Sequence, residues 1–392
     1  MAIPQHPVAS GEAPPATYRV RTVACRDVDE ETERAWARLE RRALEANAYL
    51  SPHFILPAVR HLEPAPGPVA VLVEDGTGDL LGVGVFRQRS SSWRFPLPSL
   101  AAYRSRHSYL SGLLVDRDRA SPVVAAFFTF FRGSSRWHGV EFTWRTADSP
   151  LAGLLEGAAA GHGFPWHEQY RTKRPTFIPA EGGDAYLAGH LARGRHKDLS
   201  RRRRRLEERG VVSWRFRAGA ELGPECPERL LELEHLGWKG SQGTSLRSRP
   251  EDEAFFREVV GRFGREGQAF FAELAVGGEV ISSTSNFASG RAGFAFKIGW
   301  HPDYKQCSPG LLNEVEFLRR APELLLCRDL EYIDSGAVGG SYLDTLWTTH
   351  RWLTSGVFPT TRLGKQALGL IERARRMKRR FRRPSPEERP AS

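Results

Sequence analysis

The stretch QCSPGLLNEVEFL occupies residues 306–318 and carries the clearest signal in the sequence. It predicts an apolar helix that begins at Ser308 and Pro309, because Ser is a favourable N-cap and Pro fits the first helical turn. Gly310 leaves out a side chain where the free N–H groups of that helix begin. Such an N-terminus suits a phosphate, since unpaired N–H groups and the helix dipole converge there. Ordinary helix capping explains the same residues, so the interpretation depends on what surrounds them.

The sequence on both sides of this stretch alternates between strand and helix patterns, which favours an α/β or α+β fold. Helices are predicted at residues 29–50, 121–133, 195–210, 227–240, 250–267 and 309–326, the last one broken before Pro322. Strands are predicted at residues 140–145, 211–214, 291–300 and 330–336, and hairpins at 69–88 and 268–289.

An internal repeat links the two halves of the chain. Residues 112–122 and 299–309 both fit the pattern G-x3-D-x4-S-P, and in both places a hairpin precedes the pattern and an apolar helix follows it. The shared order of elements favours a duplicated unit. The second copy has Gly310 where the first has Val123, so we expect the first copy to be a degenerate scaffold and the second to hold the active site.

Charge is concentrated in two strips of this 392-residue chain. Residues 193–205 and 371–383 each carry +7 of a net charge of +11, so the rest of the chain carries −3. The first strip contains five consecutive arginines, 201–205. A helix spreads consecutive residues around its circumference, so only two or three of them can face one partner. Local strips of this kind indicate phosphates, nucleic acid or an anionic membrane surface.

The cysteines and the N-terminus indicate a cytoplasmic protein. The four cysteines are far apart and no Cys/His spacing typical of a metal site occurs, so free thiols and no metal are expected. Residues 1–17 are rich in Pro and Ala, lack a secretory signal pattern and are predicted to be a disordered leader.

Several segments, in order, resemble the GNAT acyltransferase superfamily, and within it the branch with two tandem folds, called BioF2-like or CelD-like and related to the Fem aminoacyltransferases. They are RRRRRLEERGVVSW (201–214), LLELEHLGWKG (230–240), AFFAELAVGGEVISSTSNF (269–287), FAFKIGWHPDYKQCSPGLLNEVEFL (294–318), IDSGA (333–337) and LW (346–347). The resemblance implies two tandem GNAT-like domains, each a mixed, mostly antiparallel sheet flanked by helices. The expected boundaries are 18–175 for the N-terminal domain, 176–365 for the C-terminal domain and 366–392 for a basic tail.

The resemblance also implies a site for acetyl-CoA or another acyl-CoA. In that superfamily the helix after the fourth strand binds the cofactor pyrophosphate, and the strand before it meets the pantetheine arm. The usual Gly-rich loop is replaced here by YKQCSPG, residues 304–310. The implied cofactor-binding residues are Ile298, Gly299, Trp300, Gln306, Cys307, Ser308, Pro309, Gly310 and Leu311.

Acyl transfer to an amine needs a base, a polarised carbonyl and an acid for the leaving thiolate. Asp334 and Tyr342 are the candidates for base and acid, with a turn carboxylate and a packing aromatic as the alternatives. Lys297, in mid-strand between aromatic residues, suggests an anion contact, with a solvent-facing lysine as the alternative. Glu314 is expected at the surface, and a covalent role for Cys307 is disfavoured because no His partner has a recognisable spacing. The candidate substrate-binding residues are Arg201, Arg205, Trp238, Lys239 and His350.

Three functions remain open from the sequence. The leading one is an N-acyltransferase that uses acyl-CoA and a small amine, a sugar amine or a cell-envelope precursor as acceptor. The second is a Fem-like aminoacyl transfer from tRNA, and the third is a non-enzymatic adaptor for membrane or nucleic acid. The tail at 366–383 has Leu368, Ile371, Met377 and Phe381 on one face of a basic helix, which could lie on an anionic membrane, dock on the body of the protein or bind RNA.

Overall fold

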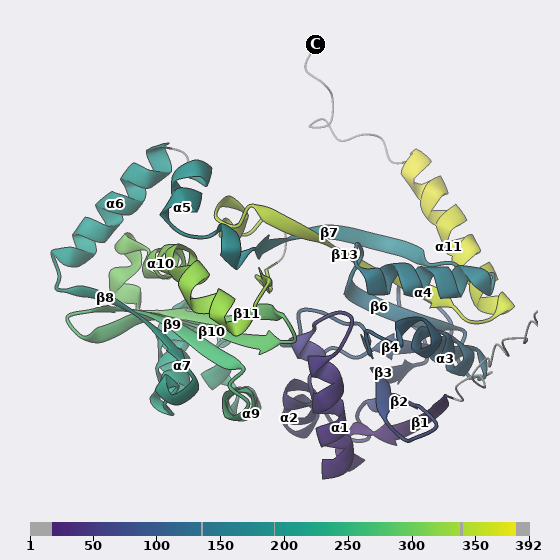
Figure 1. The fold of residues 1–392 in the computed structure, drawn as a ribbon. Coiled ribbons are helices and arrows are strands. Elements are labelled where there is room, and N and C mark those ends of the chain that lie inside the picture. The colour runs from purple at the N-terminus through teal and green to yellow at the C-terminus, as the bar shows by residue number, and fades with distance from the viewer. Residues whose placement is uncertain (1–17, 135, 192, 338–339, 382–392) are drawn as a thin grey trace, which may run out of the picture.

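The computed structural model describes residues 18–134, 136–191, 193–337 and 340–381 (Figure 1). One continuous sheet runs through the molecule in the order β1-β2-β3-β4-β6-β13-β7-β12-β11-β10-β9-β8, with β5 paired to β3. The strands are β1 (Arg19–Ala24), β2 (Val69–Glu74), β3 (Leu80–Arg89), β4 (Ser99–Ala102), β5 (Leu114–Val115), β6 (Gly139–Thr146), β7 (His167–Phe177), β8 (Val212–Ala218), β9 (Ala269–Val276), β10 (Glu279–Ser289), β11 (Ala292–Trp300), β12 (Tyr332–Asp334) and β13 (Thr349–Pro359). The α-helices are α1 (Glu30–Arg41), α2 (Pro52–Leu62), α3 (Ala120–Arg132), α4 (Pro150–Gly161), α5 (Asp184–His190), α6 (Arg193–Glu207), α7 (Glu225–Leu236), α8 (Trp238–Ser241), α9 (Pro250–Arg265), α10 (Pro309–Leu325) and α11 (Arg362–Phe381).

The two halves of the sheet repeat one arrangement. In the N-terminal half, β1 to β4 form antiparallel neighbours and β6 runs parallel to β4. In the C-terminal half, β8 to β11 form antiparallel neighbours and β12 runs parallel to β11. In the C-terminal half α10 follows the fourth strand, β11, and in the N-terminal half α3 follows the fourth strand, β4, after the short strand β5. The structure therefore confirms the predicted mixed, mostly antiparallel sheet with helices on its faces, built twice in tandem.

The two halves exchange their last strands. The N-terminal half ends in β7, which pairs with β12 of the C-terminal half. The C-terminal half ends in β13, which pairs with β6 of the N-terminal half. The exchanged strands β7 and β13 also pair with each other, from Thr349 opposite Thr176 to Val357 opposite His167. Each half is thus completed by a strand from the other. The sheet is continuous where the halves meet, and we call the region around β7 and β13 the seam.

The helices cover both faces of the sheet and one hydrophobic core crosses the seam. In the C-terminal half, α10, α5 and α6 lie on one face and α7 and α9 on the other (Figure 1). The N-terminal helix α2 packs against α9. There the Phe54 ring lies 5.3 Å from Phe255 and 5.8 Å from Phe296 between ring centroids. Aromatic contacts of this kind bury large apolar areas and hold the two halves together.

The predicted break of the 309–326 helix before Pro322 is wrong, because α10 continues through Pro322 to Leu325. Proline has no N–H to donate to the carbonyl four residues earlier, that of Leu318. The N–H of Gly183 donates to this carbonyl instead, at 3.1 Å. A Cβ on the preceding residue, Gly182, would come within 2.8 Å of both the Leu318 oxygen and Pro322 Cδ, so the linker approaches the helix closely there.

Two other predicted helices are shorter than expected. The predicted helix at 29–50 ends at Arg41, and a separate helix, α2, follows at Pro52–Leu62 with Ser51 as its N-cap. The predicted helix at 227–240 divides at Gly237 into α7 and α8. The helical spacing of apolar residues continued across these breaks, which is why the sequence did not reveal them.

The helices of the two repeat copies begin at different positions relative to the Ser-Pro pair. Ser308 is the N-cap residue of α10, whereas Ser121 and Pro122 lie inside the first turn of α3, which begins at Ala120. The aspartates differ as well. Asp116 accepts hydrogen bonds from the N–H groups of Asp118 and Arg119, whereas Asp303 is exposed and is the second residue of the 3-10 turn Pro302–Cys307.

The first part of the basic tail docks on the N-terminal half. Leu368 of α11 is buried against Phe95 and Val357, and Glu372 accepts from His167 at 2.9 Å. The side chains of Met377 and Phe381, and the predicted leader at 1–17, lie outside the described residues. Within the described ranges, no helix is both long and apolar enough to cross a lipid bilayer.

Candidate active site

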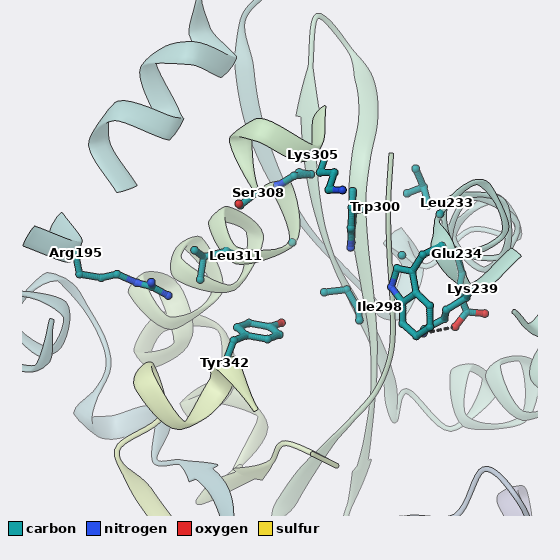
Figure 2. A pocket seen from close by; sticks show the side chains of 15 residues that line it. Arg195, Leu233, Glu234, Lys239, Ile298, Trp300, Lys305, Ser308, Leu311 and Tyr342 are labelled. Atoms are coloured by element: carbon teal, nitrogen blue, oxygen red, sulfur yellow. Dashed lines mark hydrogen bonds and ion pairs between the residues drawn. The ribbon is translucent and has the colours of Figure 1, made fainter. Parts of the chain in front are cut away.

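A groove opens where β11 and β12 diverge. The two strands pair over three residues each, ending at Phe294 opposite Asp334. Strand β11 then continues to Trp300, and no described strand pairs with it on that side. The groove in this opening has a volume of about 560 Å³ (Figure 2). Its lining comes from α6, α7, α8, β11, the α10 N-terminus and the turn after β12: Arg195, Leu233, Glu234, Gly237, Trp238, Lys239, Ile298, Gly299, Trp300, Lys305, Ser308, Pro309, Gly310, Leu311 and Tyr342.

The N-terminus of α10 forms one end of this groove. Ser308 has a left-handed backbone, with φ of 51°, and its side chain makes no capping hydrogen bond to the helix. Within the described part of the chain, the N–H groups of Gly310 and Leu311 have no hydrogen-bond partner. A Cβ on Gly310 would lie 3.2 Å from Ile298 Cδ1, facing the groove floor. Free N–H groups at a helix N-terminus favour an anion.

Basic side chains gather around the same helix end. Arg202 of α6 donates to the Ser308 hydroxyl at 2.5 Å and to the Gln306 carbonyl at 3.4 Å. Lys305 and Arg195 also line the groove, and Figure 2 shows Arg195 pointing toward it from α6. The Arg195 Nε is buried and has no hydrogen-bond partner among the described residues. Of this strip, Arg195 therefore lines the groove, and Arg202 contacts it indirectly by holding the Ser308 side chain.

Several arginines of the strip also form ion pairs. Arg201 and Arg202 both pair with Asp198, at 2.6 and 2.8 Å, and Arg203 pairs with Glu207 at 3.0 Å and with Glu316 of α10. The predicted substrate-binding residues Arg201 and Arg205 are exposed, and neither lines the groove.

The opposite wall of the groove is built by α7 and α8. Lys239 donates to Glu234 at 2.7 Å, and Glu234 also accepts the N–H of Leu246 at 2.8 Å (Figure 2). Trp238, by contrast, is 56% exposed. Gly299 allows β11 to approach this wall, because a Cβ there would lie 2.6 Å from the Glu234 nitrogen. Trp238 and Lys239 thus lie in the groove wall, with the charge of Lys239 already neutralised.

A smaller chamber of about 70 Å³ lies at the inner end of the groove and shares Ile298 and Tyr342 with it. Glu314 of α10 and Trp347 line this chamber, and the indole N–H of Trp347 donates to the Glu314 carboxylate at 2.9 Å. Burial raises the pKa of Glu314 from 4.5 to about 7. A carboxyl group with such a pKa can accept or donate a proton near neutral pH.

The expectation that Glu314 lies at the surface is wrong, since its residue is only 8% exposed. It lies four residues after Gly310, one helical turn deeper on the same face of α10. That spacing was the available signal, but a Glu in the middle of an amphipathic helix is ordinarily solvated.

The structure places the predicted catalytic residues in three surroundings. Tyr342 lines both the groove and the chamber, and Lys297 lines the chamber. Asp334 lines neither. It is fully buried, with Arg174 and Arg351 each 3.4 Å from its carboxylate, and it also accepts the Gly336 N–H at 2.8 Å.

Most of the predicted cofactor-binding residues line the groove. Seven of them line the groove, namely Ile298, Gly299, Trp300, Ser308, Pro309, Gly310 and Leu311. Gln306 is exposed and Cys307 is buried, and neither lines it. His350 lies in a separate cavity of about 740 Å³ at the seam between the halves.

Comparison with known proteins identifies the fold. Residues 193–342 match the family described as the acetyltransferase (GNAT) domain. No curated protein matches the sequence. Among solved structures, the chain is similar to FemX, with a TM-score of 0.55 and 12% identity over 87% of this chain and 98% of that chain.

Two further structures have the same overall fold. One is the C-terminal domain of a putative lysylphosphatidylglycerol synthetase from Agrobacterium fabrum, with a TM-score of 0.52 and 11% identity over 88% of this chain and 96% of that one. The other is a conserved protein of unknown function from Bacteroides thetaiotaomicron, with a TM-score of 0.51 and 10% identity over 84% and 97%. The similarity extends along nearly the whole of each chain, so it includes both halves of the sheet.

Proposed function

We propose that this tandem GNAT-fold chain is an acyltransferase that moves an acyl group, acetyl in the simplest case, from acyl-CoA to an amine acceptor. The observation that carries the proposal is the groove beside β11, which runs from the α10 N-terminus, with its free N–H groups, to a chamber lined by Glu314. A pyrophosphate would bind the N–H groups of Gly310 and Leu311, with Arg202, Arg195 and Lys305 around it. The reaction would take place in the cytoplasm, where acyl-CoA is available.

The free edge of β11 supports the same assignment. From Ala295 onward this edge has no strand partner among the described residues. Two carbonyls of this segment accept from tyrosines, that of Ala295 from Tyr49 at 3.5 Å and that of Phe296 from Tyr109 at 3.2 Å. The backbone groups beyond them that face the groove need other hydrogen-bond partners. The amide groups of a pantetheine arm can supply them while its apolar carbons lie over Ile298 and Leu311, two of the apolar residues that line the groove.

Glu314 and Tyr342 are proposed as the proton-transfer residues. The amine nitrogen attacks the thioester carbonyl, the C–S bond breaks and an amide forms. Glu314 accepts the proton that the amine loses, and the Tyr342 hydroxyl donates a proton to the departing thiolate. Both residues line the chamber that the thioester would reach.

Aminoacyl transfer from tRNA is a second candidate. Arg204 and Arg205 are exposed on α6, the helix that also carries Arg195 in the groove lining and Arg202 against Ser308. Exposed arginines beside a groove can contact the phosphates of an RNA. In that case binding of tRNA should weaken steeply as the salt concentration rises.

Thermal stabilisation by acetyl-CoA, CoA and tRNA distinguishes the two functions. Acetyl-CoA is expected to raise the melting temperature of the wild type but not of Gly310→Glu, which places a carboxylate in the groove where the cofactor phosphates would bind. Gly153→Glu is the matched control, because Gly153 lies in the first turn of α4 with open space around its Cβ position. The absence of a shift with any CoA ester would contradict the acyl-CoA proposal, and a salt-sensitive shift with tRNA would favour the second candidate.

A further inference from the structure

Helix α11 has one face packed against the N-terminal half. On this docked face, Leu368 is buried against Phe95 and Val357. Glu372 lies one turn further along the same face and bonds the His167 ring at 2.9 Å. These contacts fix the rotation of the helix about its axis, and so they determine which residues point away from the protein.

The opposite face of α11 carries an exposed apolar stripe. Leu370 is 65% exposed, and Leu363, two turns earlier, is 51% exposed. Ala367 and Ala374 belong to the same stripe, because residues three and four apart share one face of a helix. Leu370 lies about 200° around the helix from Leu368, since each residue turns it by about 100°. The contacts that bury Leu368 therefore leave the stripe exposed.

This stripe differs from the apolar face that the sequence predicted for the tail. The predicted face included Leu368, which the structure places on the docked side. Counted on from Leu370, the spacing of three and four residues reaches Ala374, Met377 and Phe381 in the sequence. The side chains of the last two lie outside the described residues, so the argument below uses the part of the stripe between residues 363 and 374.

An exposed tryptophan lies in the loop that supports the docked helix. Trp93 belongs to the loop between β3 and β4 and is 77% exposed. Phe95 of the same loop packs against Leu368 of α11, and the Arg94 guanidinium lies 5.0 Å from the centroid of the Trp93 ring. Tryptophan is enriched where proteins meet the headgroup region of a bilayer, because its ring is apolar and its N–H is polar.

Positive charge accompanies the stripe. Arg362, Lys365 and Arg373 are exposed on the described part of α11, and residues 371–383 carry a net charge of +7. The C-terminal end of the helix projects away from the rest of the N-terminal half (Figure 1). A basic amphipathic helix of this kind binds in the interface of an anionic bilayer, with its apolar face toward the acyl chains.

The stripe and the charge together distinguish a lipid surface from two other partners. An RNA would pair with the positive charge but would leave the exposed leucines in water. A second copy of the helix would cover the leucines but would bring two strongly positive segments together. An anionic lipid surface matches both features.

We propose that α11 binds the surface of an anionic lipid bilayer, with Leu363 and Leu370 entering the headgroup region and the basic residues contacting lipid phosphates. The binding is peripheral and reversible, because the helix lies in the interface and does not span the bilayer. The proposal is independent of the proposed acyl transfer.

Flotation with lipid vesicles tests the proposal on the full chain. Vesicles of phosphatidylglycerol and phosphatidylcholine in equal parts should bind the protein, whereas vesicles of phosphatidylcholine alone should not. Leu370→Glu and Leu363→Glu should each lower the partition coefficient about ten-fold, because each removes an apolar contact and adds a charge that the lipid repels. Leu326→Glu is the matched control, since Leu326 is an exposed leucine of the C-terminal half and its replacement adds the same charge. This variant should bind like the wild type.

Four results would overturn the proposal. The first is a failure of the wild type to bind the anionic vesicles, and the second is equal binding to the neutral ones. The third is equal partition of the wild type, Leu370→Glu and Leu363→Glu, because the stripe would then play no part. The fourth is self-association of the wild type that Leu370→Glu abolishes while no vesicles bind, which would assign the stripe to a second copy of the chain.

Discussion

At the scale of single residues, the surroundings change the pKa of Glu314 and the hydrogen bonding of Ser308. Glu314 is buried beside Trp347, and burial raises its pKa to about 7. Ser308 has a left-handed backbone and takes a hydrogen bond from Arg202 rather than capping its own helix. The local sequence predicted the helix start at Ser308, but the burial of Glu314 depends on residues some thirty positions away, which a local pattern does not contain.

Glu314→Gln should change how stability depends on pH. The folded-state pKa of Glu314 is raised, so the folded protein binds this proton more tightly than the unfolded chain does. The wild type should therefore lose up to about 3 kcal/mol of stability as the pH rises from about 4.5 to 7, which follows from about 1.4 kcal/mol for each pKa unit. The Gln variant lacks this loss, so it should gain on the wild type between pH 5 and pH 8 in urea unfolding.

The control for this prediction is Glu316→Gln, two residues along the same helix. Glu316 is also buried, but it forms ion pairs with Arg203 and Arg319. Its replacement should make the protein less stable than the wild type at pH 8, the opposite direction. Equal pH profiles for the wild type and Glu314→Gln would show that Glu314 is not protonated more readily in the folded state.

At the scale of elements, the basic end of the groove forms where α6 packs against the 3-10 turn Pro302–Cys307, which leads into α10. The sequence identified five consecutive arginines and the expected helix, but not which of them reach α10. That depends on the rotation of α6 about its axis, which its packing sets. Residue 202 faces Ser308, whereas residues 201, 204 and 205 are exposed. The predicted contribution of part of this helix was thus reasonable, but its assignment to residues 201 and 205 finds no support in the groove lining.

Arg202→Met should weaken acetyl-CoA binding about five- to ten-fold. The guanidinium lies beside the helix end where the cofactor phosphates would bind, and a charge-assisted hydrogen bond contributes about 1–2 kcal/mol. Arg204→Met removes the same charge from an exposed position two residues away and should change the affinity less than two-fold. Isothermal titration of both variants at two salt concentrations tests this, and equal losses would indicate that only the net charge of α6 matters.

At the scale of the whole molecule, the exchanged strands β7 and β13 make the two halves a single cooperative unit. The repeat in the sequence predicted two tandem units. It did not predict the exchange, because pairing between β6 and β13 joins residues more than 200 positions apart. Local periodicity predicts strands, whereas their order in a sheet is set by long-range packing. The expected boundary near residue 175 falls within β7, and it stays a prediction about how the chain is divided.

Arg174→Met should destabilise both halves together. Arg174 is fully buried in β7, where it donates to the Ala337 and Tyr109 carbonyls and pairs with Asp334. Removing one partner of a buried ion pair costs about 3–5 kcal/mol. Differential scanning calorimetry should show one transition, shifted to lower temperature as a whole.

Arg171→Met is the matched control on the same strand, because Arg171 is about half exposed and pairs with Glu168 at 3.6 Å. Its replacement should change stability by no more than about 0.5 kcal/mol. Two separate transitions, with only one of them shifted by Arg174→Met, would contradict the single-unit description.

The strand exchange also determines when the protein can fold during synthesis. Strand β6 is made after some 146 residues, but its sheet partner β13 is not complete until residue 359. Until then the emerging N-terminal half has an open edge at β6, and open edges pair readily with other chains. On the ribosome this edge therefore stays without its native partner until residue 359 has been made, and we expect the nascent N-terminal half to be prone to misassembly until then.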